Sequence, residues 1–143
     1  MILTKLPNRG SDDWGNGEFG SPRGSRTHKG IDYACYPLTQ IFCSVDGIVT
    51  KLGYPYGDDL GYRYVEVTDG GKFRHRYFYV EPCVKVGQRV NRASFIGTAQ
   101  DIAGRYSDPT KNSMKNHIHY EILMVNDNPV NPEIFHELVH KPS

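Results

Sequence analysis

Three short stretches of the chain carry histidines at spacings that suit a metal ion. His117 and His119 are two residues apart in "NHIHYEI", and His28 lies four residues before Asp32 in "THKGIDYA". A third stretch, residues 136–140, reads H-E-x-x-H. Imidazole and carboxylate groups are common zinc ligands, and a catalytic zinc ion takes three protein ligands and keeps a fourth position open. Each stretch is therefore a candidate part of a metal site.

The H-E-x-x-H stretch has the form of a zinc-protease helix, in which two histidines bind one metal ion and the glutamate between them serves as base. A third ligand would have to come from downstream. Only "KPS" follows, and none of these residues ligates zinc well. Chain ends also tend to fray. We therefore interpret residues 132–140 as a short terminal helix with His136 and His140 on its surface.

His117 and His119 lie in a run rich in β-forming residues, which predicts a strand over residues 117–125. Alternate side chains of a strand share a face, so both imidazoles should point to one side and Ile118 to the other. Such a pair either shares a metal ion or divides into a ligand and a catalytic base. The alternative is two surface histidines on a half-buried strand.

His28 and Asp32 would be about 13 Å apart on a straight strand, which is too far for two ligands of one ion. They converge only if the chain bends between them, and Gly30 is the residue that would permit a bend. By spacing alone the two residues are an ordinary loop pair. They gain weight only in combination with the H-x-H strand.

The composition indicates a turn-rich and strand-rich fold, because the 143 residues include 15 Gly, 9 Pro and 10 Tyr. We expect one domain over residues 1–143, mainly antiparallel β-sheet, with an N-terminal loop at residues 1–18 and the short helix at residues 132–140. The formal net charge of +1 gives no strong attraction to nucleic acid or membranes. No stretch is long enough to span a membrane, and we expect a monomer.

Turn signals separate the expected strands. Asp46-Gly47 should join two strands as a hairpin, and Asp69-Gly70-Gly71 should join another pair. The polar loop at residues 100–115 is long enough to be functional. Asn131 and Pro132 should open the helix as N-cap and first residue. The remaining expectations are a loop at 8–27 with Trp14 and Phe19 as anchors, strands at 41–45, 48–52, 62–68, 72–80 and 94–99, and a turn at Gly87.

The cysteines and the N-terminus bear on the compartment. The first residues contain too short an apolar run for a signal peptide. The odd number of cysteines, Cys35, Cys43 and Cys83, then suggests reduced thiols and synthesis in a cytosol. A zinc site built from three thiolates would need C-x₂-C spacing, which is absent. Cys43 lies in the apolar run "QIFCSV" and should be a small core residue.

Taken in chain order, these stretches resemble the lysostaphin-type (LytM-like) zinc metalloendopeptidases. "FGSPRGSRTHKGIDYAC" is similar to the segment that carries the H-x-x-x-D ligands of that family, and "HIHYE" is similar to its H-x-H motif. "SVDGIV", "YVEVTDGG", "VKVGQRV" and "FIGTA" resemble its other strands and turns. The resemblance runs from about Phe19 to Phe135. It implies β-sheets around a groove, one Zn²⁺, and hydrolysis of peptide bonds in bacterial peptidoglycan.

The resemblance implies a role for each matched residue. His28, Asp32 and His119 would bind the zinc ion and leave a water in the fourth position. His117 would be the general base or a hydrogen-bond partner of that water. Glu121 would either orient a histidine from outside the ligand set or be a solvated strand carboxylate.

One position departs from the family pattern. The family has Y-x-H before a V-x-x-G turn, and that histidine is catalytic, whereas this chain has Tyr77, Phe78 and Tyr79. The pKa of an unperturbed tyrosine is about 10, so Tyr79 could donate a hydrogen bond to an oxyanion but could not shuttle protons as histidine does. His75, on the same strand face about 13 Å away, would substitute only if the strand bulges. The vertebrate leukocyte-derived chemotaxin, which resembles a signalling protein, has the same tyrosine.

Two functions follow from the resemblance. The favoured one is a zinc endopeptidase that lyses cell walls, with Tyr79 as the oxyanion donor. The alternative is a zinc-stabilised binding domain of the same fold that has lost turnover. The missing export signal and wall-anchoring module favour a bacteriophage lysis protein or virion component, which reaches the peptidoglycan after release, over a secreted animal cytokine.

Overall fold

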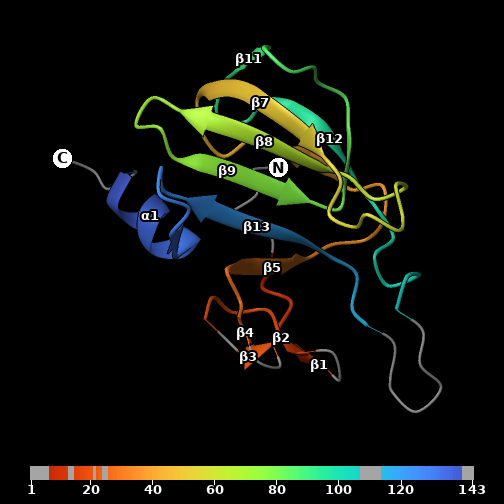
Figure 1. Cartoon of the computed structure of the whole chain (residues 1–143). Helices are drawn as coiled ribbons and strands as arrows, with labels where there is room; N and C mark the ends of the chain where they lie inside the picture. Colours follow the sequence, from red (N-terminus) through yellow and green to blue (C-terminus); the bar gives the residue numbers. More distant parts are fainter. Residues whose placement is uncertain (1–6, 13–14, 21, 24–25, 107–113, 140–143) are drawn as a thin grey trace.

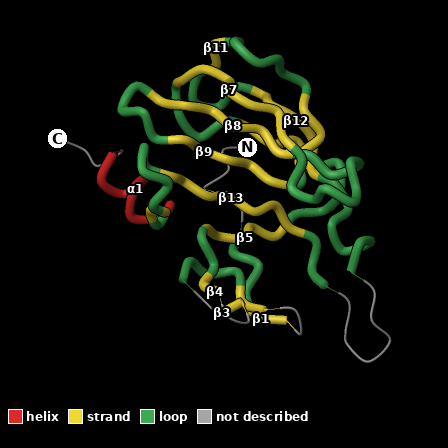
Figure 2. Tube along the Cα trace, viewed as in Figure 1, coloured by secondary structure: helices red, strands yellow, loops and turns green. Residues whose placement is uncertain are grey.

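The protein is described from a computed structural model, which covers residues 7–12, 15–20, 22–23, 26–106 and 114–139. Its fold is mainly β, as the composition predicts. The described residues form a seven-stranded and a three-stranded antiparallel sheet, two small ladders and one short helix (Figures 1 and 2). No helix in this part of the chain has the length and apolar character to cross a bilayer.

The large sheet carries most of the structure. Its strands follow the spatial order β11 (Arg89–Val90), β7 (Gly47–Gly53), β8 (Tyr64–Asp69), β9 (Arg74–Phe78), β13 (His117–Leu123) and β14 (Pro129–Val130). Strand β5 (Gly30–Ala34) also pairs with β13, over the first five residues of β13. The neighbours of β13 in Figure 1 are therefore β9 on one side and β5 on the other.

The smaller sheet has the order β10 (Val80–Pro82), β12 (Phe95–Ala99) and β6 (Gln40–Phe42). Buried aliphatic and aromatic side chains from both sheets form one hydrophobic core, with Ile41 and Ile96 from this sheet and Val65, Tyr77 and Ile118 from the large one. Cys43 lies fully buried in the same core, as predicted. The three cysteines form no disulfide.

The prediction of a hairpin at Asp46-Gly47 is wrong. Strands β6 and β7 flank this turn but belong to different sheets. The backbone groups of Cys43 instead bond to Ala93 and Ser94, and the Asp46 carboxylate accepts a hydrogen bond from the backbone N–H of Arg92 at 2.6 Å. The turn therefore carries the chain from one sheet to the other. The hairpin expected at Asp69 is confirmed by the pairing of β8 with β9.

The segment expected as loop over residues 8–27 contains four two-residue strands. These are β1 (Ser11–Asp12) with β2 (Gly15–Asn16), and β3 (Pro22–Arg23) with β4 (Arg26–Thr27). The expected N-terminal loop at residues 1–18 thus holds the first of these ladders, which Gly- and Ser-rich composition does not reveal. Phe19 packs against the core, whereas Trp14 lies outside the described residues.

Helix α1 (Pro132–Val139) begins as predicted, because the Asn131 side chain accepts a hydrogen bond from the N–H of Glu133 at 3.0 Å. The expected surface position of His136 is wrong. Its side chain is buried, and its Nε2 lies 2.7 Å from the Tyr120 hydroxyl because the helix packs on β13. His140 lies outside the described residues.

The bend expected at Gly30 is wrong, and the residue has a different role. It has no left-handed φ and is the first residue of strand β5, and His28 and Lys29 before it lie outside any strand. A Cβ at Gly30 would lie 2.2 Å from the carbonyl oxygen of Tyr120. The absence of a side chain therefore allows β5 to approach β13.

We predict that Gly30→Ala destabilises the protein, because the new Cβ forces β5 away from β13. Overpacking of this kind costs about 1–3 kcal/mol, so Tm in thermal unfolding should fall. Gly57→Ala is the matched control, since no atom lies within 4 Å of a Cβ at that position. Equal Tm values for the two variants would contradict this role of Gly30.

Candidate metal centre and active site

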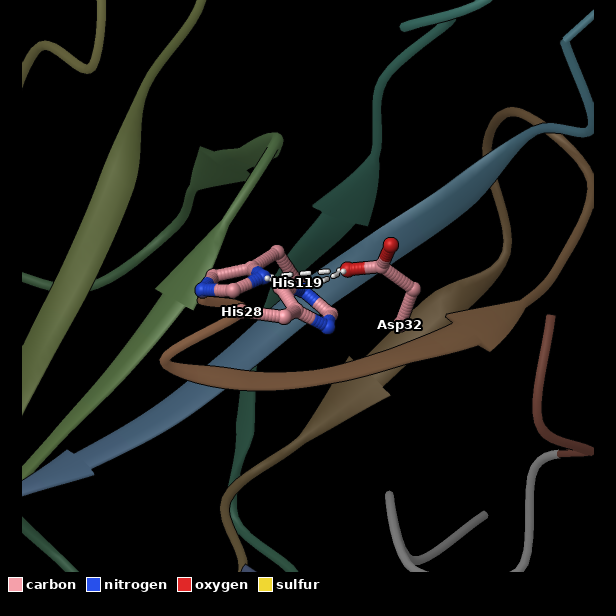
Figure 3. Close-up of side chains that lie close together, drawn as sticks. All are labelled: His28, Asp32 and His119. Atoms are coloured by element: carbon pink, nitrogen blue, oxygen red, sulfur yellow. Dashed lines mark hydrogen bonds and ion pairs between the residues drawn. The ribbon is translucent and has the colours of Figure 1, made fainter. Parts of the chain in front are cut away.

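Three potential ligand atoms meet above β5 and β13 (Figure 3). His28 Nε2 lies 3.0 Å from Asp32 Oδ1 and 2.9 Å from His119 Nδ1, and the last two atoms are 3.0 Å apart. In a tetrahedral zinc site, bonds of about 2.0–2.1 Å separate ligand atoms by roughly 3.3 Å. The triangle therefore needs to open by only a few tenths of an ångström to accept a metal ion.

Strand register and local hydrogen bonds aim these atoms. Asp32 lies directly opposite His119 in the β5–β13 pair. His28 precedes β5, and its Nδ1–H donates to the carbonyl of Glu18 at 2.9 Å, which leaves the Nε2 lone pair for a metal ion. The Nε2–H of His119 donates to Glu121 Oε1 at 2.9 Å, which leaves its Nδ1 lone pair for the same ion.

Glu121 belongs to a chain of charged groups on this face of the sheet. Its second oxygen lies 3.7 Å from Arg76 Nη1, and Arg76 Nε donates to Glu66 at 2.8 Å. Glu121 is only 7% exposed. This burial excludes the solvated carboxylate and favours the role of orienting His119, because metal-bound imidazoles typically donate their other N–H to a carboxylate.

Arg9 is a residue of the site that the sequence interpretation missed. Its Nη1 donates to Asp32 Oδ2 at 2.9 Å, and its backbone N–H donates to the Asp32 carbonyl at 2.7 Å. The side chain is 2% exposed. Arg9 therefore holds the Asp32 oxygen that faces away from the other ligands. No spacing pattern links the two residues, since 23 positions separate them.

The ionisation of the ligands reflects their proximity. Burial opposes the charge on Asp32, but its close contacts with His119 and His28 outweigh it and hold the pKa of Asp32 well below its usual value. Burial also disfavours the charged form of His119, but its bonds to Asp32 and Glu121 raise the pKa of His119 to about 9. A bound cation must displace that proton, so metal affinity should rise with pH.

His117 shares the face of His119, as the H-x-H spacing predicts, but makes different contacts. Its Nδ1–H donates to the carbonyl of Lys115 at 2.8 Å, so Nε2 carries the lone pair. That Nε2 lies 3.7 Å from Asp32 Oδ2, outside the triangle of ligand atoms. Burial lowers the pKa of His117. An imidazole with an Nε2 lone pair therefore lies beside the three candidate ligand atoms.

The ligand triangle lies in a cavity of about 460 Å³. The walls combine cations, histidines and tyrosines from segments far apart in the chain, namely Arg9, His28, Lys29, Asp32, Pro55, Tyr56, Phe78, Tyr79, Ile102, Tyr106, Met114, His117, His119 and Glu121. The segment at residues 100–115, expected to be functional, contributes Ile102, Tyr106 and Met114.

A comparison with protein families matches residues 26–132 to the model of peptidase family M23. This match spans most of the chain. The chain belongs to peptidase family M23. A search of curated protein sequences gives no significant match.

Solved structures of M23 proteins share this fold. A mutant catalytic domain of the prophage-encoded M23 protein EnpA from Enterococcus faecalis superposes with a TM-score of 0.63 at 23% identity, covering 91% of this chain and 96% of that one. LytU superposes with a TM-score of 0.67 at 22% identity, covering 94% of this chain and 92% of that one. The antimicrobial peptidase lysostaphin from Staphylococcus simulans superposes with a TM-score of 0.66 at 21% identity, covering 95% of this chain and 53% of that one. At these identities the likeness shows the fold alone.

Tyr79, the departure from the M23 pattern, lines the cavity and occupies an unusual backbone conformation. Its φ is +67°, at the junction between β9 and β10. Bulky residues rarely adopt this region, which costs about 1–3 kcal/mol. Two backbone hydrogen bonds hold the conformation. The N–H of Tyr79 donates to the carbonyl of Arg63, and the carbonyl of Tyr79 accepts from the N–H of Gln100, both at 2.8 Å.

The prediction that His75 and Tyr79 share one face of the strand is wrong, because of this backbone conformation at Tyr79. The left-handed residue interrupts strand alternation, so His75 and Tyr77 point into the core while Tyr79 points into the cavity. His75 is fully buried, with Nε2 2.8 Å from Asp69 Oδ2 and Nδ1 2.7 Å from the Tyr120 hydroxyl. His75 therefore cannot take the place of the missing M23 histidine.

We predict that His28→Ala and His119→Ala lose a metal ion that wild type binds in a one-to-one ratio, because each removes one of three ligands. Elemental analysis after gel filtration measures the content. His136→Ala is the matched control, since this histidine lies on the core side of β13. Metal loss in the control, with retention in His28→Ala, would assign the ion to the terminal helix.

We predict that Glu121→Gln binds the metal more weakly by about 10–100-fold, the usual effect of losing a carboxylate that orients a ligand. A competition titration with a fluorescent chelator gives the affinity. Glu81→Gln, at an exposed position in β10, should bind as wild type does. An unchanged affinity in Glu121→Gln would show that Glu121 does not support His119.

Proposed function

We propose that this chain is a zinc metalloendopeptidase that hydrolyses peptide bonds in bacterial peptidoglycan. The observation that carries the proposal is the convergence of His28, Asp32 and His119 on one point in the cavity of an M23 fold. Lysostaphin is an antimicrobial peptidase and EnpA is encoded by a prophage. These relatives support the substrate class and a bacteriophage origin for this chain.

Zinc is the metal that suits this donor set. Two imidazoles and one carboxylate form a common ligand set of catalytic zinc, with one position left for water or substrate. When bound, zinc supplies a Lewis acid that lowers the pKa of a water ligand and polarises the scissile carbonyl. His28, Asp32 and His119 would hold the ion, while Glu121 and Arg9 fix the orientation of His119 and Asp32 through hydrogen bonds.

His117 is the proposed general base. Its Nε2 lone pair accepts the proton of the attacking water, while its Nδ1–H remains bonded to the Lys115 carbonyl. The protonated imidazole then returns this proton to the leaving amine nitrogen as the C–N bond breaks. The lowered pKa of His117, which burial causes, keeps the side chain neutral before each turnover.

Tyr79 is the proposed donor to the carbonyl oxygen as that oxygen becomes negative. Burial raises the pKa of Tyr79 to about 12, so the phenol keeps its hydrogen at neutral pH. Its ring packs edge-on against His117, with ring centroids 5.6 Å apart. The proposed base and the proposed donor are therefore adjacent in the cavity wall.

The same tyrosine favours a second candidate function. A phenol cannot exchange protons as the usual M23 histidine does, so the chain would be a zinc-stabilised binding domain if the donor role of Tyr79 does not sustain turnover. Zymography on purified cell walls, with and without a chelator, separates the two. Chelator-sensitive clearing supports the peptidase, and zinc-loaded protein that clears no wall preparation supports the binding domain.

We predict that His117→Ala keeps its metal and loses hydrolysis, because His117 is the base and not a ligand. Metal content by elemental analysis and wall lysis by turbidity are measured on the same sample. Full activity in this variant would remove His117 from the mechanism.

We predict that Tyr79→Phe lowers the lysis rate by about 10²–10³, the typical effect of losing one oxyanion donor. Metal content and Tm should change little, because only a hydroxyl is removed. Tyr79→His, which restores the usual M23 residue, should retain or raise activity if the imidazole reaches the same point. A Tyr79→Phe enzyme as fast as wild type would reduce Tyr79 to a packing role.

A further inference from the structure

Three tyrosine hydroxyls form a row beside the metal position. The oxygens of Tyr106 and Tyr56 are 2.6 Å apart, and those of Tyr56 and Tyr79 are 3.3 Å apart. The residues come from the segment after β12, the loop between β7 and β8, and the β9–β10 junction. All three line the cavity. The row thus runs along the cavity wall and ends at Tyr79, beside the proposed base His117.

The middle member of the row is held in place by its neighbours. The Tyr56 ring stacks on the Tyr79 ring, with centroids 6.2 Å apart and planes 10° apart. The guanidinium of Arg105 lies 3.7 Å from the centre of the Tyr56 ring and forms ion pairs with Asp58 and Asp59. A cation over an aromatic face stabilises the ring position. The hydroxyl of Tyr56 therefore has a defined place opposite that of Tyr79.

Each phenol has a single hydrogen, so the row has a direction. Burial raises the pKa of both Tyr56 and Tyr79, and each hydroxyl keeps its hydrogen at neutral pH. If Tyr79 donated to Tyr56, its hydrogen would point along the row and would not be available to a bound carbonyl oxygen. If Tyr106 donates to Tyr56 and Tyr56 donates to Tyr79, all three oxygens are satisfied and the Tyr79 hydrogen is free to point into the cavity.

We propose that Tyr56, supported by Tyr106, is a positioning residue that directs the Tyr79 hydroxyl hydrogen toward the scissile carbonyl. An imidazole N–H has a fixed direction, whereas a phenol O–H rotates about its C–O bond. A tyrosine at this position therefore needs a partner that the usual M23 histidine does not need. Successive hydrogen bonds in one direction also polarise one another, which makes the last donor stronger. This inference rests on the proposed peptidase function.

We call the row in which Tyr106 donates to Tyr56 and Tyr56 donates to Tyr79 the relay. A double-mutant cycle with Tyr56→Phe and Tyr79→Phe tests it in zinc-loaded protein. Both changes keep the rings, so the stacking persists. Losing one hydrogen bond should lower kcat by about 3–10-fold in Tyr56→Phe, with little change in KM. In the Tyr79→Phe background the same change should have no further effect, because Tyr56 acts only through the Tyr79 hydroxyl.

Tyr62→Phe is the matched control. Its ring packs edge-on against both Tyr56 and Tyr79, but its hydroxyl donates to the Asp101 carbonyl at 2.7 Å. This variant should keep wild-type kcat. A loss in Tyr62→Phe as large as that in Tyr56→Phe would mean that the cluster acts through packing and would overturn the relay, as would equal losses from Tyr56→Phe in both backgrounds.

The affinity for inorganic phosphate, measured by calorimetry, is a second readout that does not depend on which peptide is cleaved. Phosphate is a tetrahedral oxyanion, so its affinity should show the same coupling between Tyr56 and Tyr79. Coupling in a protein that cleaves no peptidoglycan would support the relay and refute the peptidase function. The absence of coupling, including an absence of phosphate binding, overturns the relay even if the protein is an active peptidase.

Discussion

The pairing of β5 with β13 is the interaction on which the site depends. Its register places Asp32 opposite His119 and Gly30 opposite Glu121. Two ligands thereby reach the same point without any contribution from a flexible loop. Where Gly30 faces Glu121, the two strands lie so close together that only glycine fits in β5. A shift of one residue would turn His119 toward the core and Ile118 toward the metal position, because strand side chains alternate. The site and the core are therefore specified by the same register.

Alternation along β13 also divides the histidines between two environments. His117 and His119 point to the cavity, while Tyr120 points to the core and meets His75 and His136 there. Ser44 donates to the same Tyr120 hydroxyl at 2.8 Å. Buried polar groups need such partners, since each unpaired one costs about 1–3 kcal/mol. The histidine of the H-E-x-x-H stretch that the structure describes is thus a structural residue that attaches helix α1 to the sheet.

Tyr79 links backbone strain to chemistry. Its left-handed conformation ends β9 in the large sheet and begins β10 in the small one, and it turns the side chain from the core to the cavity. Strain of this kind persists only where surrounding contacts maintain it. Here those contacts are the backbone bonds to Arg63 and Gln100 and the packing against Tyr56. The tyrosine that departs from the M23 pattern is accordingly one of the best fixed residues of the site.

The sequence by itself determined the features that depend on short-range geometry. The main strands after residue 40, the Asp69 turn, the N-cap at Asn131 and the common face of His117 and His119 all follow from periodicities of a few residues. The motif spacing, read with the family resemblance, also indicated His28 and Asp32. Only the tertiary structure decided which strands pair. The Asp46 turn connects two sheets, Gly30 serves close approach rather than a bend, and His136 is buried, because each outcome depends on what packs against the residue. Arg9, Tyr56 and Tyr106 belong to the site for the same reason. Their hydrogen-bond partners lie 23 or more positions away along the chain, and no local pattern records such contacts.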